Sequence, residues 1–163
     1  MSSMDANQKK YPYLPEGREI LYVPEADPFM TLAKDVHLES NDLKNPTGAV
    51  VVKNGEVVSS VSNKNPLNNK FLINLHKKFC IRRFLKIPTG KYYGLCPGCA
   101  GYETHAERRA VDQALDKGID INGADLYLYG HWWCCKPCWD SMIKAGIKNV
   151  YLVEGAEEMF KRK

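Results

Sequence analysis

Two cysteines in the C-terminal third of the chain have the spacing of metal ligands. Cys135 and Cys138 lie in the segment CKPC, where Pro137 is typical of the first turn of a helix. Residues three apart at a helix start present their side chains on one side, at a separation that a zinc ion with Zn–S bonds of about 2.3 Å can bridge. A helix N-terminus also favours the thiolate, which is the form that binds metal. The pair therefore predicts two zinc ligands at the start of a helix.

A third ligand is expected from the preceding helix, which begins near His105-Ala106-Glu107. Consecutive parallel βα units bring the N-termini of their helices to the same edge of a sheet. His105 is therefore expected to meet Cys135 and Cys138 around one ion. Three protein ligands leave a fourth position for water, which is the arrangement of a catalytic zinc site and not of a structural one.

A second group of metal-ligand residues precedes this motif. Cys96 and Cys99 enclose a Pro-Gly pair with the composition of a tight turn, and His76 and Cys80 are four apart, on one face if their segment is helical. Together the four would form a closed, structural zinc site. In the alternative interpretation, Cys80 is only buried and the turn binds no metal.

The composition fits one domain: 163 residues, 44% apolar and 26% charged. We expect an N-terminal arm at 1–25 and a single domain at 26–163 that carries the cysteine-containing insertion at about 64–102. No apolar run approaches the roughly 18 residues of a membrane span, and no apolar signal opens the chain, so the sequence predicts a cytoplasmic protein without membrane contact. In that compartment the six cysteines are thiols or metal ligands, not disulfides. The formal net charge of +4 permits an anionic ligand without showing one.

The segments around the motif predict an α/β fold. Residues 26–40 show apolar residues at helical spacing, and two β-branched runs in 47–62 meet at Asn54-Gly55, a strong hairpin signal. The further expected elements are an edge strand within 18–24, a helix at 104–118 with Thr104 or Glu103 near its start, a strand at 124–130, a helix at 135–145, a strand at 148–154 and a short polar helix. This order implies a sheet whose later strands are parallel and joined by right-handed crossovers. The insertion is expected to be irregular.

The motif order resembles that of a known enzyme superfamily. His105-Ala106-Glu107, followed thirty residues later by Cys135-Lys136-Pro137-Cys138, is similar to the signature of the zinc-dependent cytidine deaminases. The stretch 103–153, including AGIKNVYLV, looks most like the deoxycytidylate (dCMP) deaminase branch, and the hairpin at 48–62 precedes the motif in the same order. The resemblance implies a three-layer α-β-α cytidine-deaminase-like fold with a mixed sheet.

The resemblance also implies an activity, a cofactor and a set of pocket residues. The chain would be a zinc-dependent hydrolytic deaminase that converts dCMP to dUMP and releases ammonia. Zinc would lower the pKa of water toward neutrality, and Glu107 would carry protons to the ring N3 and to the departing ammonia. Asn63 would hold the sugar, and Ala106 and Trp133 would contribute to substrate binding. A pyrimidine nucleotide would be the small-molecule partner of a homo-oligomer.

Three departures from the family pattern leave the substrate open. Cys134 stands where the family usually has Pro, Arg109 stands where the dCMP branch usually has Asn, and VSNKNP at 61–66 replaces GYNGFP. Cys134 is interpreted as a small packed residue.

Two other function classes stay open at this stage. Trp132 and Trp133 resemble aromatic residues on which extruded bases stack, and the insertion is basic, so the substrate could be cytidine within DNA or RNA. The same tryptophans equally fit core or subunit contacts, and the charges fit a solvated face. The other class is a non-catalytic zinc-binding interaction module. Glu107 argues against it, because a structural site has no use for a carboxylate beside an open position.

Overall fold

The computed structural model describes residues 12–88, 91–99 and 101–161 of the chain. Residues 1–11 of the expected arm lie outside these ranges. The elements follow in the order β1 (Ile20–Val23), α1 (Pro28–His37), β2 (Gly48–Lys53), β3 (Glu56–Ser62), α2 (Lys70–Lys78), α3 (Ile81–Phe84), η1 (Tyr93–Leu95), η2 (Tyr102–Thr104), α4 (Ala106–Asp116), β4 (Asp125–Tyr129), α5 (Lys136–Lys144), β5 (Asn149–Val153) and α6 (Ala156–Phe160).

The strands form one mixed sheet in the order β1-β5-β4-β2-β3. The later strands β4 and β5 are parallel to each other, and β1 pairs parallel to β5 at the edge. The hairpin strand β2 is antiparallel to both β3 and β4. The predicted α/β class with parallel later strands is confirmed. The edge strand within 18–24 is also confirmed, so part of the expected arm belongs to the sheet.

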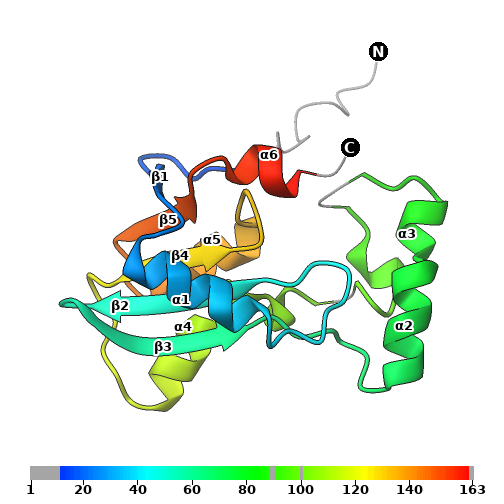
Figure 1. Cartoon of the computed structure of the whole chain (residues 1–163), viewed down its shortest axis with the longest axis horizontal. Coiled ribbons are helices and arrows are strands. Elements are labelled where there is room, and N and C mark those ends of the chain that lie inside the picture. Colours follow the sequence, from blue (N-terminus) through cyan, green and yellow to red (C-terminus); the bar gives the residue numbers. More distant parts are fainter. Residues whose placement is uncertain (1–11, 89–90, 100, 162–163) are drawn as a thin grey trace.

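Helices cover both faces of this sheet. Helix α1 lies against β2, β3 and β4 on one face, while α4 and α5 pack together on the other (Figure 1). The side chain of Asp27 caps α1 by accepting hydrogen bonds from the backbone N–H groups of Phe29 and Met30. Close contact between α1 and β2 depends on Gly48, because a Cβ there would lie 2.2 Å from the carbonyl oxygen of Ala33. The central strands therefore carry a core that is closed from both sides.

We expected the insertion to be irregular, and this expectation is wrong. The insertion contains the helices α2 and α3, which lie beside the sheet (Figure 1). Local capping explains α2. The Asn69 side chain accepts hydrogen bonds from the N–H groups of Phe71 and Leu72, and the basic side chains of the last turn suit the negative end of the helix. The helix is amphipathic but only nine residues long, and it buries only Ile73 and His76, so its apolar period is repeated too few times to identify it from the sequence.

Among the described residues, no helix is long and apolar enough to cross a membrane.

Candidate active site

The predicted motif residues lie at the N-termini of α4 and α5. His105 is the N-cap residue of α4 and Cys135 that of α5. Helix α4 begins at Ala106, slightly later than the sequence suggested, because Tyr102–Thr104 forms a separate 3-10 turn. Both helices pack on the same face of the sheet, so their N-termini meet at one edge, as expected for βα units.

The structure brings His105, Cys135 and Cys138 together, with their donor atoms within 4.8 Å of one another. The Nδ1 atom of His105 lies 3.5 Å from Sγ of Cys135 and 3.4 Å from Sγ of Cys138. Tetrahedral zinc places nitrogen and sulfur ligands about 3.5 Å apart, so these distances fit the ion. The two sulfurs are 3.0 Å apart and would have to separate toward about 3.7 Å to hold a zinc ion. The hydrogen bond with Cys138 lowers the pKa of Cys135 to about 5, which favours a thiolate ligand.

Glu107 is a buried carboxyl group in the first turn of α4, with 5% of its surface exposed. Burial raises the pKa of this carboxyl above its usual value. The fully buried Cys134 thiol hydrogen bonds to it, and burial raises the pKa of Cys134, so the thiol keeps its proton and donates. Cys134 is packed in the core as expected, and it also contacts Glu107.

A small chamber of about 110 Å³ opens beside Glu107. Ala106 and Trp133, which the resemblance assigned to substrate binding, both line it. The ring of Trp133 is 5% exposed and meets the His131 ring edge-on at 5.2 Å. Trp132 instead packs against the hydrophobic core and lines only the wider cavity outside. One tryptophan is therefore a chamber wall, and its neighbour is largely a packing residue.

Asn63 also lines the chamber, but its amide is engaged within the chain. Its Oδ1 accepts hydrogen bonds from the Thr47 N–H at 2.9 Å and the Ser40 hydroxyl at 2.6 Å. Its Nδ2 donates to the carbonyl of Asn45 at 2.8 Å and to Asp42 at 3.4 Å. The side chain thus anchors the loop between α1 and β2 to the end of β3.

Four chamber residues were missed by sequence reasoning: Asp42, Asn45, Thr47 and Tyr93. Asp42 and Asn45 lie in the segment SNDLKNPTG, whose turn-forming residues directly precede a strand and could have drawn attention to the loop. Tyr93 comes from the insertion, and nothing local in the sequence indicates that it reaches this chamber.

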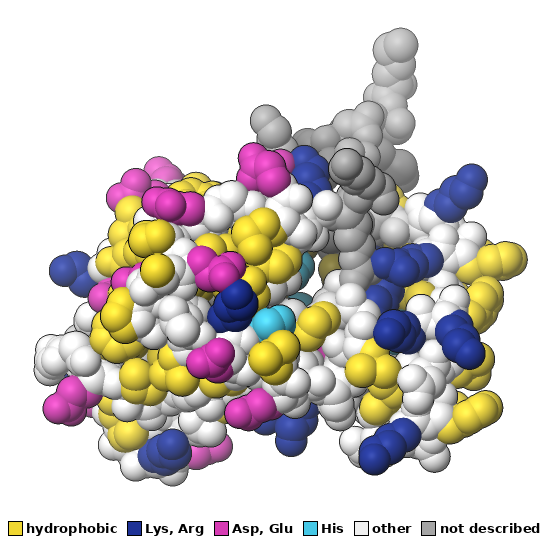
Figure 2. All heavy atoms as spheres, viewed as in Figure 1, with side chains coloured by type: hydrophobic (Ala, Val, Ile, Leu, Met, Phe, Trp, Pro, Cys, Tyr) yellow, Lys and Arg dark blue, Asp and Glu magenta, His cyan; other side chains and the backbone are white. Residues whose placement is uncertain are grey.

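A wider cavity of about 480 Å³ continues outward from the chamber, between the sheet edge and the insertion. Among the described residues that line it, four are basic, Lys44, Arg82, Arg83 and Lys161, and Asp42 carries the single carboxylate. Between positions 64 and 102 the sequence has eight Lys or Arg residues and no Asp or Glu. Figure 2 shows Lys and Arg side chains gathered over the α2–α3 side, with most Asp and Glu on the other side. The cavity is therefore suited to an anionic group.

The structure also brings the second predicted group together, since the donor atoms of His76, Cys80, Cys96 and Cys99 lie within 4.8 Å of one another. His76 and Cys99 line the wider cavity, as His105 does.

Comparison with known proteins agrees with these features. A model of the cytidine and deoxycytidylate deaminase zinc-binding region matches residues 24–154. The ComE operon protein 2 of Bacillus subtilis is 38% identical over 64 residues, which are 36% of this chain and 33% of that protein. The match therefore spans about a third of the length of this relative.

Solved structures of similar fold include the dCMP deaminase of the cyanophage S-TIM5 in complex with dCMP and dUMP. It is 22% identical over 80% of this chain and 84% of that chain, with a TM-score of 0.51, a likeness that supports the fold alone. A diaminohydroxyphosphoribosylaminopyrimidine deaminase/5-amino-6-(5-phosphoribosylamino)uracil reductase from Thermotoga maritima is 26% identical over 76% of this chain and 28% of that chain, with a TM-score of 0.46.

Proposed function

Because the chain belongs to the family of proteins with the cytidine and deoxycytidylate deaminase zinc-binding region, we propose that it is a hydrolase that removes the amino group of a cytosine nucleotide, with dCMP as substrate. The observation that carries this proposal is the buried carboxyl group of Glu107, beside three metal-ligand side chains and a chamber. A site that only held the fold together would have no need of such a group.

We assign the ligands of the catalytic zinc to His105, Cys135 and Cys138, whose donor set and spacing suit the ion. Bound there, zinc supplies a Lewis acid that makes water nucleophilic near neutral pH.

Glu107 is the proton carrier in this proposal. Its carboxylate accepts a proton from the attacking water, donates it to N3 of the pyrimidine, and later delivers a proton to the amino group that leaves as ammonia. The C4–O bond forms first. The proton of the new hydroxyl group then passes through Glu107 to the amino group, and the C4–N bond breaks as C4 becomes a carbonyl, so that cytosine and water become uracil and ammonia. The Cys134 hydrogen bond holds the carboxyl group in place during these transfers.

The two cavities support a nucleotide substrate. The inner chamber has room for one aromatic ring against Trp133, and the basic outer cavity suits a phosphate group. We assign the sugar to Asn63, whose long hydrogen bond to Asp42, at 3.4 Å, is the one most easily exchanged for a sugar hydroxyl. The backbone at Ala106 would contact the base.

Exposed basic side chains on α2 and α3 favour a second candidate, a deaminase of cytidine in single-stranded DNA or RNA. Lys77, Lys78 and Arg83 are all exposed, and Arg83 lines the outer cavity, so a polynucleotide backbone could follow these side chains toward it.

Ammonia release from dCMP, CMP, deoxycytidine and a cytosine-containing single-stranded oligonucleotide tests the proposal. We expect the highest kcat/KM for dCMP, with deoxycytidine well below it because it lacks the phosphate. A Cys135→Ala protein purified in the same way controls for contaminating deaminases. A preference for the oligonucleotide would favour the second candidate, and zinc-loaded protein without turnover on any of the four would overturn the enzymatic assignment.

A further inference from the structure

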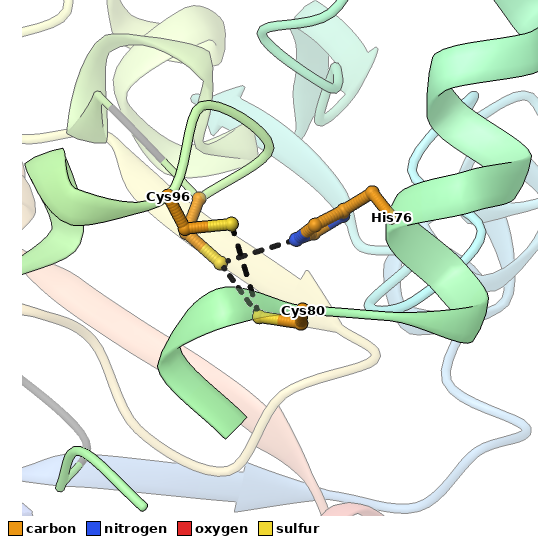
Figure 3. A group of neighbouring side chains, drawn as sticks. His76, Cys80 and Cys96 are labelled. Carbon is orange, nitrogen blue, oxygen red and sulfur yellow. Dashed lines mark hydrogen bonds between the residues drawn. The ribbon is translucent and has the colours of Figure 1, made fainter. Parts of the chain in front are cut away.

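His76, Cys80, Cys96 and Cys99 form a compact group that the proposed reaction does not use. His76 lies in the last turn of α2, Cys80 is the N-cap residue of α3, and the other two flank the Pro-Gly turn after η1. Figure 3 shows the side chains of His76, Cys80 and Cys96 pointing toward one another. His76, Cys80 and Cys96 are buried, and the cysteines are free thiols.

The distances within this group match tetrahedral coordination. Sγ of Cys80 lies 3.9 Å from Sγ of Cys96 and 3.6 Å from Sγ of Cys99. Sγ of Cys99 lies 3.4 Å from Nε2 of His76. Tetrahedral zinc separates two sulfur ligands by about 3.7 Å and a sulfur from a nitrogen by about 3.5 Å. An ion therefore fits at the centre with little movement of the side chains.

We propose that these four residues bind a second zinc ion, in a closed site that holds the fold of the insertion at 64–102. Four protein ligands leave no position for water, which is the mark of a structural site. None of the four ligands lines the chamber beside Glu107, so the site takes no part in the proposed proton transfers, although His76 and Cys99 line the wider cavity.

The insertion needs such a centre because it buries little apolar surface. Among its described residues, the buried hydrophobic side chains are Ile73 and the two ligands Cys80 and Cys96. Phe71 and Phe84 are exposed by 72% and 71%. Apolar packing of this extent does not hold two short helices and a loop in one arrangement, whereas a bound metal does so in other small folding units.

Two neighbours of the group are suited to a metal centre. A Cβ at Gly98 would lie 2.4 Å from Cγ of His76, so only glycine allows the turn to pack this closely on the imidazole. The ammonium group of Lys44 lies 3.1 Å from Sγ of Cys80 and 3.8 Å from Sγ of Cys99. Three thiolates and a neutral imidazole around a divalent ion carry one net negative charge, which Lys44 offsets. Because Lys44 precedes β2, it also links the insertion to the sheet.

Metal analysis of the purified full-length chain tests this site. We expect two zinc ions per chain in the parent, and one in both the Cys96→Ser/Cys99→Ser and the Cys135→Ser/Cys138→Ser variants. Cys134→Ala, which removes a cysteine that belongs to neither group, should keep two. One zinc in the parent, or an unchanged zinc count after loss of Cys96 and Cys99, would overturn the proposal.

A double cysteine variant could lose zinc because it fails to fold, so a second pair of single variants tests the site separately. Gly98→Ala should weaken zinc binding and speed tryptic cleavage at the exposed Lys77, Lys78 and Arg83, because the added methyl group pushes His76 away from the sulfurs. Gly94→Ala is the matched control, since a Cβ there meets no atom within 4 Å. Equal zinc content and equal cleavage rates in the two variants would contradict the site. Two zinc ions in a protein without deaminase activity would support it while refuting the proposed reaction.

Discussion

Glu107 and Cys134 form a buried pair at the centre of the candidate site. Sequence comparison with the family pattern marks Cys134 only as a departure, in a position usually occupied by proline. In the fold its thiol hydrogen bonds to the Glu107 carboxyl group, which proline could not do. The departure therefore adds a polar contact to the group that we propose as proton carrier.

Glu107→Gln is expected to lower kcat for dCMP by about 10² to 10⁴, because an amide cannot transfer the proton that a carboxyl group transfers. Zinc content and thermal stability should match the parent, since Glu107 is not among the assigned ligands. Glu103→Gln is the control, because Glu103 is exposed in the turn before α4. Parental kcat in Glu107→Gln would remove this residue from the mechanism.

Cys135→Ala and Cys138→Ala are each expected to abolish turnover and to lower the zinc content by one ion per chain. Loss of one thiolate leaves two protein ligands, which hold zinc far more weakly than three. Metal analysis after dialysis and assay of ammonia release measure both effects. If either variant kept the full zinc content of the parent, the ligand assignment would be wrong.

Among the secondary-structure elements, the N-termini of α4 and α5 position the proposed zinc ligands and Glu107. His105 and Cys135 are the N-cap residues of α4 and α5, and neither side chain makes a capping hydrogen bond, so neither is committed to its helix end. Helix α1 is different: the side chain of Asp27 caps its N-terminus, and the helix covers one face of the sheet. The N-cap side chains of α4 and α5 are thus available to bind a metal ion, whereas the N-cap side chain of α1 stabilises its own helix.

Asp27→Ala is expected to lower the free energy of unfolding by about 1 kcal/mol, the usual cost of losing an N-cap side chain. Both hydrogen bonds to the N–H groups of Phe29 and Met30 are lost in this variant. Urea denaturation measures the change, with Asp35→Ala as control because Asp35 is exposed within the same helix. An equal loss of stability in both variants would show that the cap contributes nothing specific.

At the scale of the whole molecule, the wider cavity lies between the edge of the sheet and the basic insertion at 64–102. The sheet edge contributes His105 and Trp133, and the basic insertion contributes Arg82 and Arg83. The Arg82 guanidinium is committed to the fold, since it donates to the carbonyls of Pro88 and Lys91 and lies 4.0 Å from the ring centroid of Tyr93. Arg83 is exposed and is the better candidate to meet a phosphate group.

Arg83→Gln is expected to raise KM for dCMP about fivefold, the equivalent of about 1 kcal/mol for one charge interaction at a solvated surface. The KM for deoxycytidine should not change, because that substrate has no phosphate. Lys77→Gln is the control, since Lys77 is an exposed cation of the same insertion that does not line the cavity. An equal rise for both substrates in Arg83→Gln would point to a disturbed cavity and not to a lost phosphate contact.

Sequence alone determined the features that depend on neighbours along the chain. Strand and helix periodicity, Asn54-Gly55 and the CKPC segment predict the hairpin, the βα order and the helix start that carries Cys135 and Cys138. These predictions hold because apolar spacing, turn chemistry and helix-start chemistry act within a few residues. Consecutive parallel βα units place the N-termini of their helices at one edge of the sheet, and this rule brings His105 close to Cys135.

Only the tertiary structure decided the features that depend on distant segments. Helix α2 was missed because its amphipathic pattern extends over only nine residues and buries only Ile73 and His76, so the helical period is repeated too few times to identify it. Tyr93 and Lys44 reach the cavity only because the insertion folds back onto the loop before β2. The same folding brings His76 to Cys99, and the internal hydrogen bonds of Asn63 likewise join a strand end to a distant loop. Spacing along a chain limits which side chains can meet, but the path of the intervening loops decides which of them do.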